Sequence, residues 1–472
     1  MPFITLALLA AVLIWSSGCR KDVVTDNPSA RLAFSVDTLT FDTVFTTLGS
    51  TTLSFKVYNR NRQAVETDIM LAGGDASNFR INVDGLPGRK HQNVLIYGND
   101  SIYVFVEVTV DPNNQNTPVV IYDSVLFETN GNRQKVILEA WGQDAYFYKD
   151  SILPSGIWSN EKPHVILRYA IVDSGANLQI REGTQIYMGG NAQFIVYGTG
   201  KILVTGTKDQ PVVFQGIRLE DFYEDLPGQW AGIFILRGSR NNLFEYAIIK
   251  NSDYGINLGS VPARIDTCAD ITTLITNTNI PQVTLRNCII QNSFYSGLSG
   301  LFSEITAENC LVFGSSDHLI SLVYGGNYRL NHCTFANYGS ALLNHQVPVL
   351  FTSNVLYCDF APYVAELILQ TDNTIIYGSL DEEIKFEVAD TSFAEIVFDH
   401  CLLKTKLQTD TVSIVGSILN QDPHFTDPAE DDYTLKDDSP CINAGKPSPL
   451  MTDLNGNART DTPDIGAYEF VP

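Results

Sequence analysis

The chain is poor in basic residues. Among its 472 residues, 30 are Lys or Arg and 53 are Asp or Glu, which gives a formal net charge of −23. Nucleic acids and anionic membranes attract basic surfaces, and no polybasic stretch occurs here. The composition therefore argues against a nucleic-acid partner. It also makes a highly anionic polysaccharide a less natural ligand, unless bound cations or a local basic cleft intervene.

Several motifs of metal and catalytic sites are missing. Eight Cys occur without any Cys-x-x-Cys of a zinc cluster, and no Gly-x-Ser-x-Gly marks a nucleophilic serine. The stretch from Asp453 to Asn457 resembles a calcium loop at first glance. Its Gly456 comes too early for an EF-hand, and Asp464 stands where a bidentate Glu is required. We predict a turn there, and no metal or cofactor.

Long apolar runs are rare, and one of them opens the chain. Residues 1–18 contain no charged side chain, and Phe3 to Trp15 is nearly continuous apolar sequence. The run is too short to span a bilayer comfortably, so we predict a signal peptide over residues 1–18. Only the amino terminus supplies positive charge before the run.

The signal sequence ends in Ser16-Ser17-Gly18-Cys19, which resembles a bacterial lipobox, although Ser16 stands where the common pattern has Leu. The resemblance implies that Cys19 carries a lipid, with residues 19–30 as a flexible tether. The following Arg20-Lys21-Asp22 resembles the charged tether of surface lipoproteins in the Bacteroidetes group. An ordinary secretory peptide with a chance Cys is the alternative. The predicted location is the outer membrane, by lipid anchor only, on its periplasmic or its external side.

Helical periodicity is absent, and alternation of apolar and polar residues replaces it. Between residues 31 and 145 about seven such stretches occur, separated by Gly, Asn, Asp and Pro. Short alternating strands at this spacing predict an antiparallel β-sandwich. The segment resembles bacterial immunoglobulin-like modules in architecture, without the Cys pair of antibody domains.

A repeat then dominates residues 243–401. Successive copies centre on Cys288, Cys310 and Cys333, in steps of 22 and 23 residues, with further copies assigned to Ala247, Val355 and Cys401. Each copy has apolar pairs at strand spacing around one polar residue. A period of about 22 residues with short strands predicts the coil of a parallel β-solenoid. The Cys then form an inward stack, and a polar column marks the bend: Asn287, Asn309, His332, Asn354 and His400.

Two other stretches support this fold. Residues 178–207, with Gly-Thr at successive bends, resemble the first coils of right-handed β-helix proteins of the pectate-lyase-like group. We therefore predict an all-β chain, with a right-handed parallel β-helix over residues 146–420. Residues 421–472 resemble the closing segment of many secreted bacterial β-helix proteins, and we expect them to hide the open apolar end of the solenoid. The matching residues are Asp422, Pro423, Phe425, Tyr433, Leu435, Ser439, Pro440, Ile442, Ala444, Gly445 and 464–469.

No catalytic residue is assigned from the sequence. Carbohydrate chemistry on such a fold needs carboxylates, or a Lys or Arg base, clustered on neighbouring coils. Acidic residues lie near the repeats without recurring in one outward column, and two basic residues lie in adjacent copies at different offsets. Asp317-His318 is placed in a loop beside Tyr324. The residues considered are Glu245, Glu304, Glu308, Asp399, Lys250 and Arg286.

Two functions remain open at this point. The preferred hypothesis is a non-catalytic binding or structural surface for a polysaccharide or a cell-surface protein. The alternative is a polysaccharide lyase or glycoside hydrolase, which the resemblance allows but does not establish. Two insertions, at residues 261–280 and 361–395, are the expected location of any site, together with the exposed strands between them.

Overall fold

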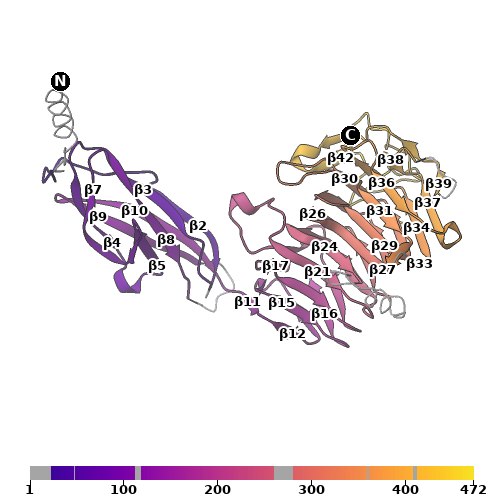
Figure 1. Cartoon of the computed structure of the whole chain (residues 1–472), viewed down its shortest axis with the longest axis horizontal. Coiled ribbons are helices and arrows are strands. Elements are labelled where there is room, and N and C mark those ends of the chain that lie inside the picture. The colour runs from indigo at the N-terminus through magenta and orange to yellow at the C-terminus, as the bar shows by residue number, and fades with distance from the viewer. Residues whose placement is uncertain (1–22, 47, 112–118, 260–279, 359–360, 408–411) are drawn as a thin grey trace, which may run out of the picture. The chain divides into compact units, whose positions relative to one another are not determined.

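The computed structural model describes residues 23–46, 48–111, 119–259, 280–358, 361–407 and 412–472 (Figure 1). The chain forms two compact units, Met1–Asp144 and Ala145–Pro472. Cys19 and residues 261–279 of the first predicted insertion lie outside the described residues. In the described part of the chain, no helix is long and apolar enough to cross a membrane.

The first unit is a two-layer β-sandwich, as predicted. One five-stranded sheet has the order β1 (Ala33–Phe34), β3 (Leu53–Asn59), β8 (Asp100–Val108), β5 (Phe79–Val83) and β6 (Leu86–Gly88). The other has the order β2 (Thr38–Phe45), β10 (Asn132–Gln143), β9 (Val119–Thr129), β4 (Val65–Leu71) and β7 (Lys90–Ile96). Buried and exposed residues alternate along β8, so one face meets the core and the other meets solvent. One pair, β10 with β2, is parallel.

The described part of the predicted tether is bound to this sandwich. Val24 forms a bridge with Ala64, and the backbone N–H of Thr25 donates to the carbonyl of Ala64 at 2.9 Å. The side-chain amide of Asn130 donates to the carbonyl of Thr25 at 2.8 Å. The prediction of a flexible tether up to residue 30 is therefore wrong from residue 24 onward, because these polar contacts hold the backbone.

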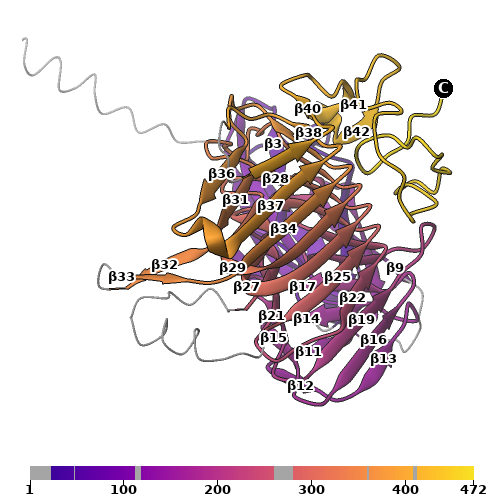
Figure 2. The same ribbon diagram turned by 90° about the vertical axis from the view of Figure 1, so that its right-hand side faces the viewer.

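The second unit is a parallel β-helix, and each coil contributes to three rows of stacked strands (Figure 2). One row is the eleven-stranded sheet: β11 (Tyr146–Tyr148), β14 (His164–Ile166), β17 (Gln185–Met188), β20 (Val212–Gly216), β23 (Ala247–Lys250), β26 (Ile289–Ser293), β28 (Leu311–Ser315), β30 (Thr334–Asn337), β35 (Ile375–Gly378), β38 (Leu402–Leu403) and β40 (Ile418–Leu419).

The other two rows belong to one seventeen-stranded sheet, because the long strands β27 (Ser296–Glu308) and β29 (Ile320–Asn331) run through both. Apart from these, row 1 contains β12 (Ser151–Leu153), β15 (Tyr169–Val172), β18 (Gln193–Val196), β21 (Trp230–Ile235), β24 (Ser252–Leu258), β31 (Leu350–Ser353) and β36 (Ile384–Glu387). Row 2 contains β13 (Gly156–Trp158), β16 (Asn177–Arg181), β19 (Lys201–Thr205), β22 (Asn242–Glu245), β25 (Gln282–Arg286), β34 (Leu367–Asp372), β37 (Ala394–Asp399) and β39 (Val412–Val415).

The predicted inward stack of Cys is confirmed in four positions. Cys288, Cys310, Cys333 and Cys401 are all 0 % exposed and belong to the apolar core of the β-helix. All four are free thiols. Burial raises the pKa of Cys401 to about 12, so this thiol stays protonated. The column therefore fills the core of the β-helix.

The predicted copy at Val355 is wrong. Val355 lies in a hairpin of β32 (Val355–Cys358) and β33 (Ala361–Val364), which projects from the side of the β-helix (Figure 2). The coil continues through β34 and β35, where Thr374 stands in the Cys position. The Thr374 side-chain oxygen accepts a hydrogen bond from the N–H of Cys333 at 3.2 Å. The predicted insertion at residues 361–395 is consequently mostly regular coil. An Asn followed by apolar residues occurs both in the hairpin, at Asn354, and in the true coil, at Asn373. The sequence pattern therefore does not distinguish the two.

The polar column at the bend is confirmed with one exchange. Asn287, Asn309, His332, Asn373 and His400 all have positive φ, between 47° and 54°, in the left-handed region that Asn tolerates best. Neighbours bond to one another: the Asn309 amide donates to the Asn287 Oδ1 at 3.1 Å, and the Asn373 amide lies 3.0 Å from the His332 Nε2. Asn354, which was predicted here, instead donates to the carbonyl of Asp390 at 2.8 Å.

The C-terminal segment packs along a flank of the β-helix instead of over its open end. Its core contacts lie on the outer face of the eleven-stranded sheet, which carries apolar side chains that need cover. The segment includes β41 (Phe425–Asp427) and β42 (Asp432–Leu435). Its contacting residues are Phe425, Tyr433, Leu435, Cys441, Leu454, Ile465, Ala467 and Tyr468. The contacting residues of the sheet are Leu311, Phe313, Ala336, Ile375, Tyr377 and Leu402.

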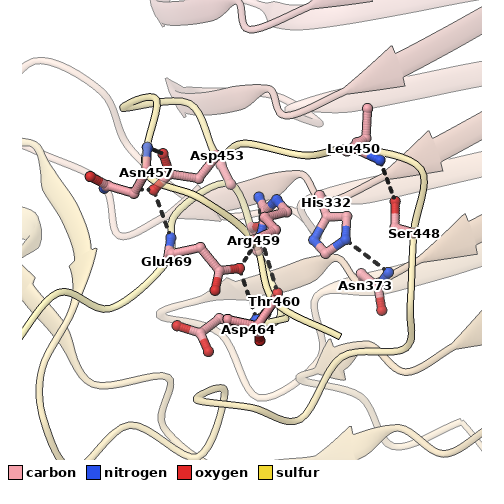
Figure 3. Close-up of polar contacts among 12 residues, drawn as sticks. His332, Asn373, Ser448, Leu450, Asp453, Asn457, Arg459, Thr460, Asp464 and Glu469 are labelled. Atoms are coloured by element: carbon pink, nitrogen blue, oxygen red, sulfur yellow. Dashed lines mark hydrogen bonds and ion pairs between the residues drawn. The ribbon is translucent and has the colours of Figure 1, made fainter. Parts of the chain in front are cut away.

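The turn at Asp453 is confirmed. Its Oδ1 accepts from the N–H of Asn457 at 2.7 Å, and its Oδ2 accepts from the N–H of Glu469 at 2.8 Å (Figure 3). The carboxylate therefore closes a loop of the segment. Within the described ranges, no group of three or more His, Cys, Asp or Glu is arranged to hold a metal ion.

Candidate functional site

Charged residues near the repeats do share an outward column, contrary to the sequence prediction. Strand register places Glu245 beside Arg286, and Arg286 beside Glu308. The same column continues through Asn331 and Asp372 to Asp399. Unequal loop lengths between the coils hide this alignment in the sequence.

The charges of this column are mostly paired, which argues for a structural role. Arg286 Nε lies 2.8 Å from a Glu308 oxygen. Lys446 of the C-terminal segment lies 2.8 Å from Asp372 and 2.5 Å from Asp399. Burial alone raises the pKa of Asp399, but hydrogen bonds from Lys446 and His400 outweigh it and leave the pKa below its usual value. The two carboxylates therefore hold the segment rather than face a ligand.

Another set of residues gathers where each coil passes from the eleven-stranded sheet into row 1. Asp253, Tyr295 and Asp317 lie on three successive coils. The N–H of Tyr295 donates to the carbonyl of Asp253 at 2.8 Å, and the N–H of Asp317 donates to the carbonyl of Tyr295 at 3.1 Å. Two carboxylates thus lie one coil above and one coil below an aromatic ring. Together with four neighbours they form what we call the acidic aromatic strip: Asp253, Tyr254, Phe294, Tyr295, Asp317, His318 and Phe351.

The rings of the strip pack in two groups, and two of the rings remain open to solvent. Tyr254 and Tyr295 stack with centroids 5.1 Å apart at 25°, and Phe294 meets Tyr295 edge-on at 4.9 Å. His318 stacks on Phe351 with centroids 4.9 Å apart at 17°. Phe294 is 41 % exposed and Tyr295 is 42 % exposed. Exposed, rigidly stacked rings offer a large contact area at low entropic cost.

The polar groups of the strip are held in defined states. Burial raises the pKa of the Asp253 carboxyl. Burial, then Tyr295, then Asp253 and Asp317 raise the pKa of Tyr254, so both carboxylates act on the same phenol. His318 Nδ1 lies 2.6 Å from the Pro348 carbonyl, which can only accept a hydrogen bond. Nδ1–H therefore donates, and Nε2 is left as the acceptor when the ring is neutral.

A loop of residues 217–229 borders the strip. A Cβ added to Gly228 meets Asp253 Oδ1 at 3.3 Å and Phe294 Cβ at 3.5 Å, so the loop lies directly against both residues. The Asn251 amide donates to the carbonyls of Tyr223 at 3.2 Å and Glu224 at 2.8 Å, and this fixes the loop from beneath. Asn251 begins a second polar column on successive coils, which continues with Asn292, Gly314 and Asn337. This column therefore anchors a wall beside the strip.

Sequence reasoning identified one pair of this site and missed the rest. Asp317-His318 is in the strip, but Tyr324 is not beside it: Tyr324 is buried against Phe302 and Leu301. The missed residues were detectable in principle. Asp253-Tyr254, Phe294-Tyr295 and Asp317-His318 each follow shortly after the second polar column, at Asn251-Ser252, Asn292-Ser293 and Gly314-Ser315.

Part of the β-helix matches a known family. Residues 153–257 match the pectate-lyase like beta helix domain. The match includes Asp253 and Tyr254 and ends before the later coils of the strip. No curated protein matches this chain.

Solved structures give weaker likenesses. The YadV chaperone matches at TM-score 0.17 and 9 % identity, over 24 % of this chain and 51 % of that chain. The ASH / PapD-like domain 7 of human CEP192 matches at 0.18 and 11 %, over 27 % and 94 %. A family 123 glycoside hydrolase from Clostridium perfringens matches at 0.16 and 10 %, over 24 % and 26 %. This chain thus spans about half of the chaperone and about a quarter of the hydrolase, and scores this low carry no argument about function.

Proposed function

We propose that this is an exported protein, anchored in the outer membrane by a lipid on Cys19, whose β-helix binds a polysaccharide along the acidic aromatic strip without cleaving it. The observation that carries the proposal is the stacking of exposed rings and carboxylates on successive coils. The match of residues 153–257 to the pectate-lyase like beta helix domain supports a carbohydrate ligand.

The chemistry of the strip suits a neutral glycan. A sugar ring has apolar C–H faces that pack on aromatic rings and hydroxyl groups that donate to carboxylates. Asp253 and Asp317 are its acidic groups, and the whole chain carries a net charge of −23. Like charges in contact cost affinity, so a polyuronate is disfavoured at this surface. The repeat of about 4.8 Å between coils lets an extended chain meet several rings in succession.

Tyr295→Ala is expected to lower glycan affinity about tenfold. Removing the ring takes away stacking and buried area worth about 1.4 kcal/mol. Binding is measured by calorimetry with defined neutral and acidic oligosaccharides on the full chain. Tyr197→Ala is the matched control, because Tyr197 is 53 % exposed on another part of the β-helix. Equal affinity of the wild type and Tyr295→Ala, or preference for a polyuronate, contradicts the proposal.

A second candidate function, glycoside hydrolysis, is favoured by one observation. Asp253 and Asp317 are two coils apart, or about 9.6 Å along the stack at about 4.8 Å per coil. Inverting glycosidases place the carboxyl groups of an acid and a base about 6.5–9.5 Å apart, and this backbone spacing lies just above the upper limit of that range. Burial raises the pKa of Asp253, as required of an acid, while Asp317 is exposed. Both groups are carboxyls, so hydrolysis is favoured over a lyase reaction.

One assay distinguishes binding without cleavage from hydrolysis. If the strip only binds, no reducing ends accumulate when the full chain is incubated with the glycan that it binds. If it hydrolyses, reducing ends accumulate, and Asp253→Asn and Asp317→Asn each abolish them while binding is retained. Release of product by the wild type overturns the preferred, non-catalytic proposal.

The anchor is tested independently of the strip. Cys19→Ala is expected to move the protein from the membrane fraction to the soluble fraction, because no lipid can be attached at residue 19. Cell fractionation with a labelled lipid precursor measures both localisation and lipid incorporation. Retention of the variant in the membrane fraction contradicts lipidation at Cys19.

A further inference from the structure

The first unit has a hollow on one outer sheet face, well away in sequence from the acidic aromatic strip. Its volume is about 710 Å³, and it is formed by residues of β8, β5 and the β6 hairpin together with Thr52. Ligand sites in proteins are typically clefts of about 300–1,000 Å³, lined by apolar side chains and a few polar groups. The hollow has this size. Its lining combines the apolar residues Ile81, Pro87 and Phe105 with the polar residues Thr52, Arg80, Asn82, Arg89 and Glu107.

An aromatic platform borders the hollow. Tyr103 and Phe105 are neighbours on the outward face of β8, and their rings stack with centroids 5.8 Å apart at 20°. Tyr103 is 42 % exposed and Phe105 is 38 % exposed. Lys56 Nζ lies 4.8 Å from the Tyr103 centroid, which fixes that ring from the neighbouring strand. Two stacked, partly exposed rings form a rigid contact surface with few rotatable bonds.

Polar groups surround the Phe105 ring. Register places Asn82 next to Phe105, and Arg80 next to Glu107. A Glu107 oxygen accepts from the Thr52 hydroxyl at 2.7 Å. The Asn82 Oδ1 atom is buried and has no hydrogen-bond partner among the described residues. A buried carbonyl oxygen left unpaired costs free energy, and because Asn82 lines the hollow, rotation of its amide toward a ligand hydroxyl would remove that cost.

From these features we propose that the hollow binds carbohydrate, as a second glycan site in addition to the strip. A pyranose ring brings an apolar face for Phe105 and Tyr103, and hydroxyl groups for Asn82, Arg80 and Glu107. A purely apolar ligand would desolvate these polar groups without replacing their hydrogen bonds. An added peptide strand would pair with an edge of the sheet, but β8 and β5 are interior strands. The edge strand β6 has only three residues, and Pro87 at its centre has no N–H to donate.

The test uses the full chain in which Tyr254→Ala and Tyr295→Ala already disable the strip. Calorimetry with cello-, xylo-, manno- and chito-hexaose is expected to give one remaining site. Phe105→Ala in this background should lower its affinity at least tenfold, and Asn82→Ala should lower it several-fold. Tyr122→Ala is the matched control, since Tyr122 is 65 % exposed on the other sheet of the same unit.

Each outcome decides the proposal. Loss with Phe105→Ala and no change with Tyr122→Ala support it. No binding of any of the four hexaoses in the strip-disabled background, or binding that Phe105→Ala leaves unchanged, overturns it. The strip proposal fails separately, because its failure appears as unchanged affinity of Tyr295→Ala in an otherwise native chain. Unfolding curves recorded for every variant exclude misfolding as the cause of lost binding.

Discussion

Arg459→Met is expected to destabilise the β-helix unit by about 3–5 kcal/mol and to release the C-terminal segment. The guanidinium is 2 % exposed and lies 2.5 Å from Glu469, which is 8 % exposed (Figure 3). Its Nη2 donates to the Asn309 Oδ1 at 2.9 Å and to the Gly466 carbonyl at 3.0 Å. Removing one partner of a buried ion pair leaves an uncompensated charge, which accounts for this magnitude. Arg459 also bonds the segment to the polar column at the bend, as Lys446 does through Asn373.

The release of the segment can be measured directly. Chemical unfolding gives the change in free energy, and limited proteolysis reports whether residues 421–472 become cleavable. Arg329→Met is the matched control: Arg329 is exposed in row 2, so its replacement is expected to change stability by less than about 0.5 kcal/mol. The double variant Arg459→Met with Glu469→Gln should lose less than the sum of the single losses, because it removes the orphaned charge. Unchanged stability and proteolysis of Arg459→Met would show that docking of the segment does not depend on the buried ion pair.

The contacts of Arg459 explain why the closing segment contains the sequence motif at residues 464–469. The closing segment was recognised by its resemblance, and residues 464–469 were among the matching positions. The Asp464 carboxylate accepts from the N–H of Asn443 at 2.7 Å and of Phe470 at 2.6 Å. Glu469 accepts from the N–H of Asp464 at 2.9 Å as well as from Arg459. Residues 464–469 therefore form a hydrogen-bonded loop that holds the buried guanidinium of Arg459. The sequence pattern alone does not show this contact.

The period of the repeat was sufficient to predict the β-helix, the inward Cys and the left-handed bend. The period did not predict which residues are stacked on one another wherever a coil contains a long loop. The Cys333 place is followed 41 residues later by Thr374, and both the substitution and the intervening hairpin concealed the copy. The strip was missed for the same reason, since Asp253 and Tyr295 are 42 residues apart in sequence and adjacent in the stack.

Side chains buried by loops were even less predictable. His345 and Glu383 are an example, because neither lies in a motif that the sequence shows. The two meet at 3.0 Å with 1 % and 0 % of their side chains exposed. They are 38 residues apart and belong to no repeat, so only the fold brings them together. The His345 Nδ1 atom lies 2.9 Å from the Asn337 amide, which donates to it, and Nε2–H therefore donates to Glu383.

Glu383→Ala is expected to destabilise the unit by about 3–5 kcal/mol and also to weaken glycan binding at the strip. Glu383 accepts from the N–H of Leu380 at 2.7 Å and of Val349 at 3.1 Å, besides His345. All three donors are left without an acceptor in the variant. Val349 adjoins Pro348, whose carbonyl holds His318 of the strip at 2.6 Å. Loss of the carboxylate therefore loosens the backbone that orients a strip residue.

The expected changes are a lower free energy of unfolding, faster amide exchange at Val349 and Leu380, and reduced affinity for the oligosaccharide that the wild type binds. Glu383→Gln keeps the shape and one acceptor oxygen, so its loss should be smaller, about 1–3 kcal/mol. Glu387→Ala is the control, because Glu387 is exposed on the same strand. A stable Glu383→Ala variant with normal exchange contradicts the structural role of the pair. A destabilised variant with native affinity shows instead that the strip does not depend on the loop beneath His318.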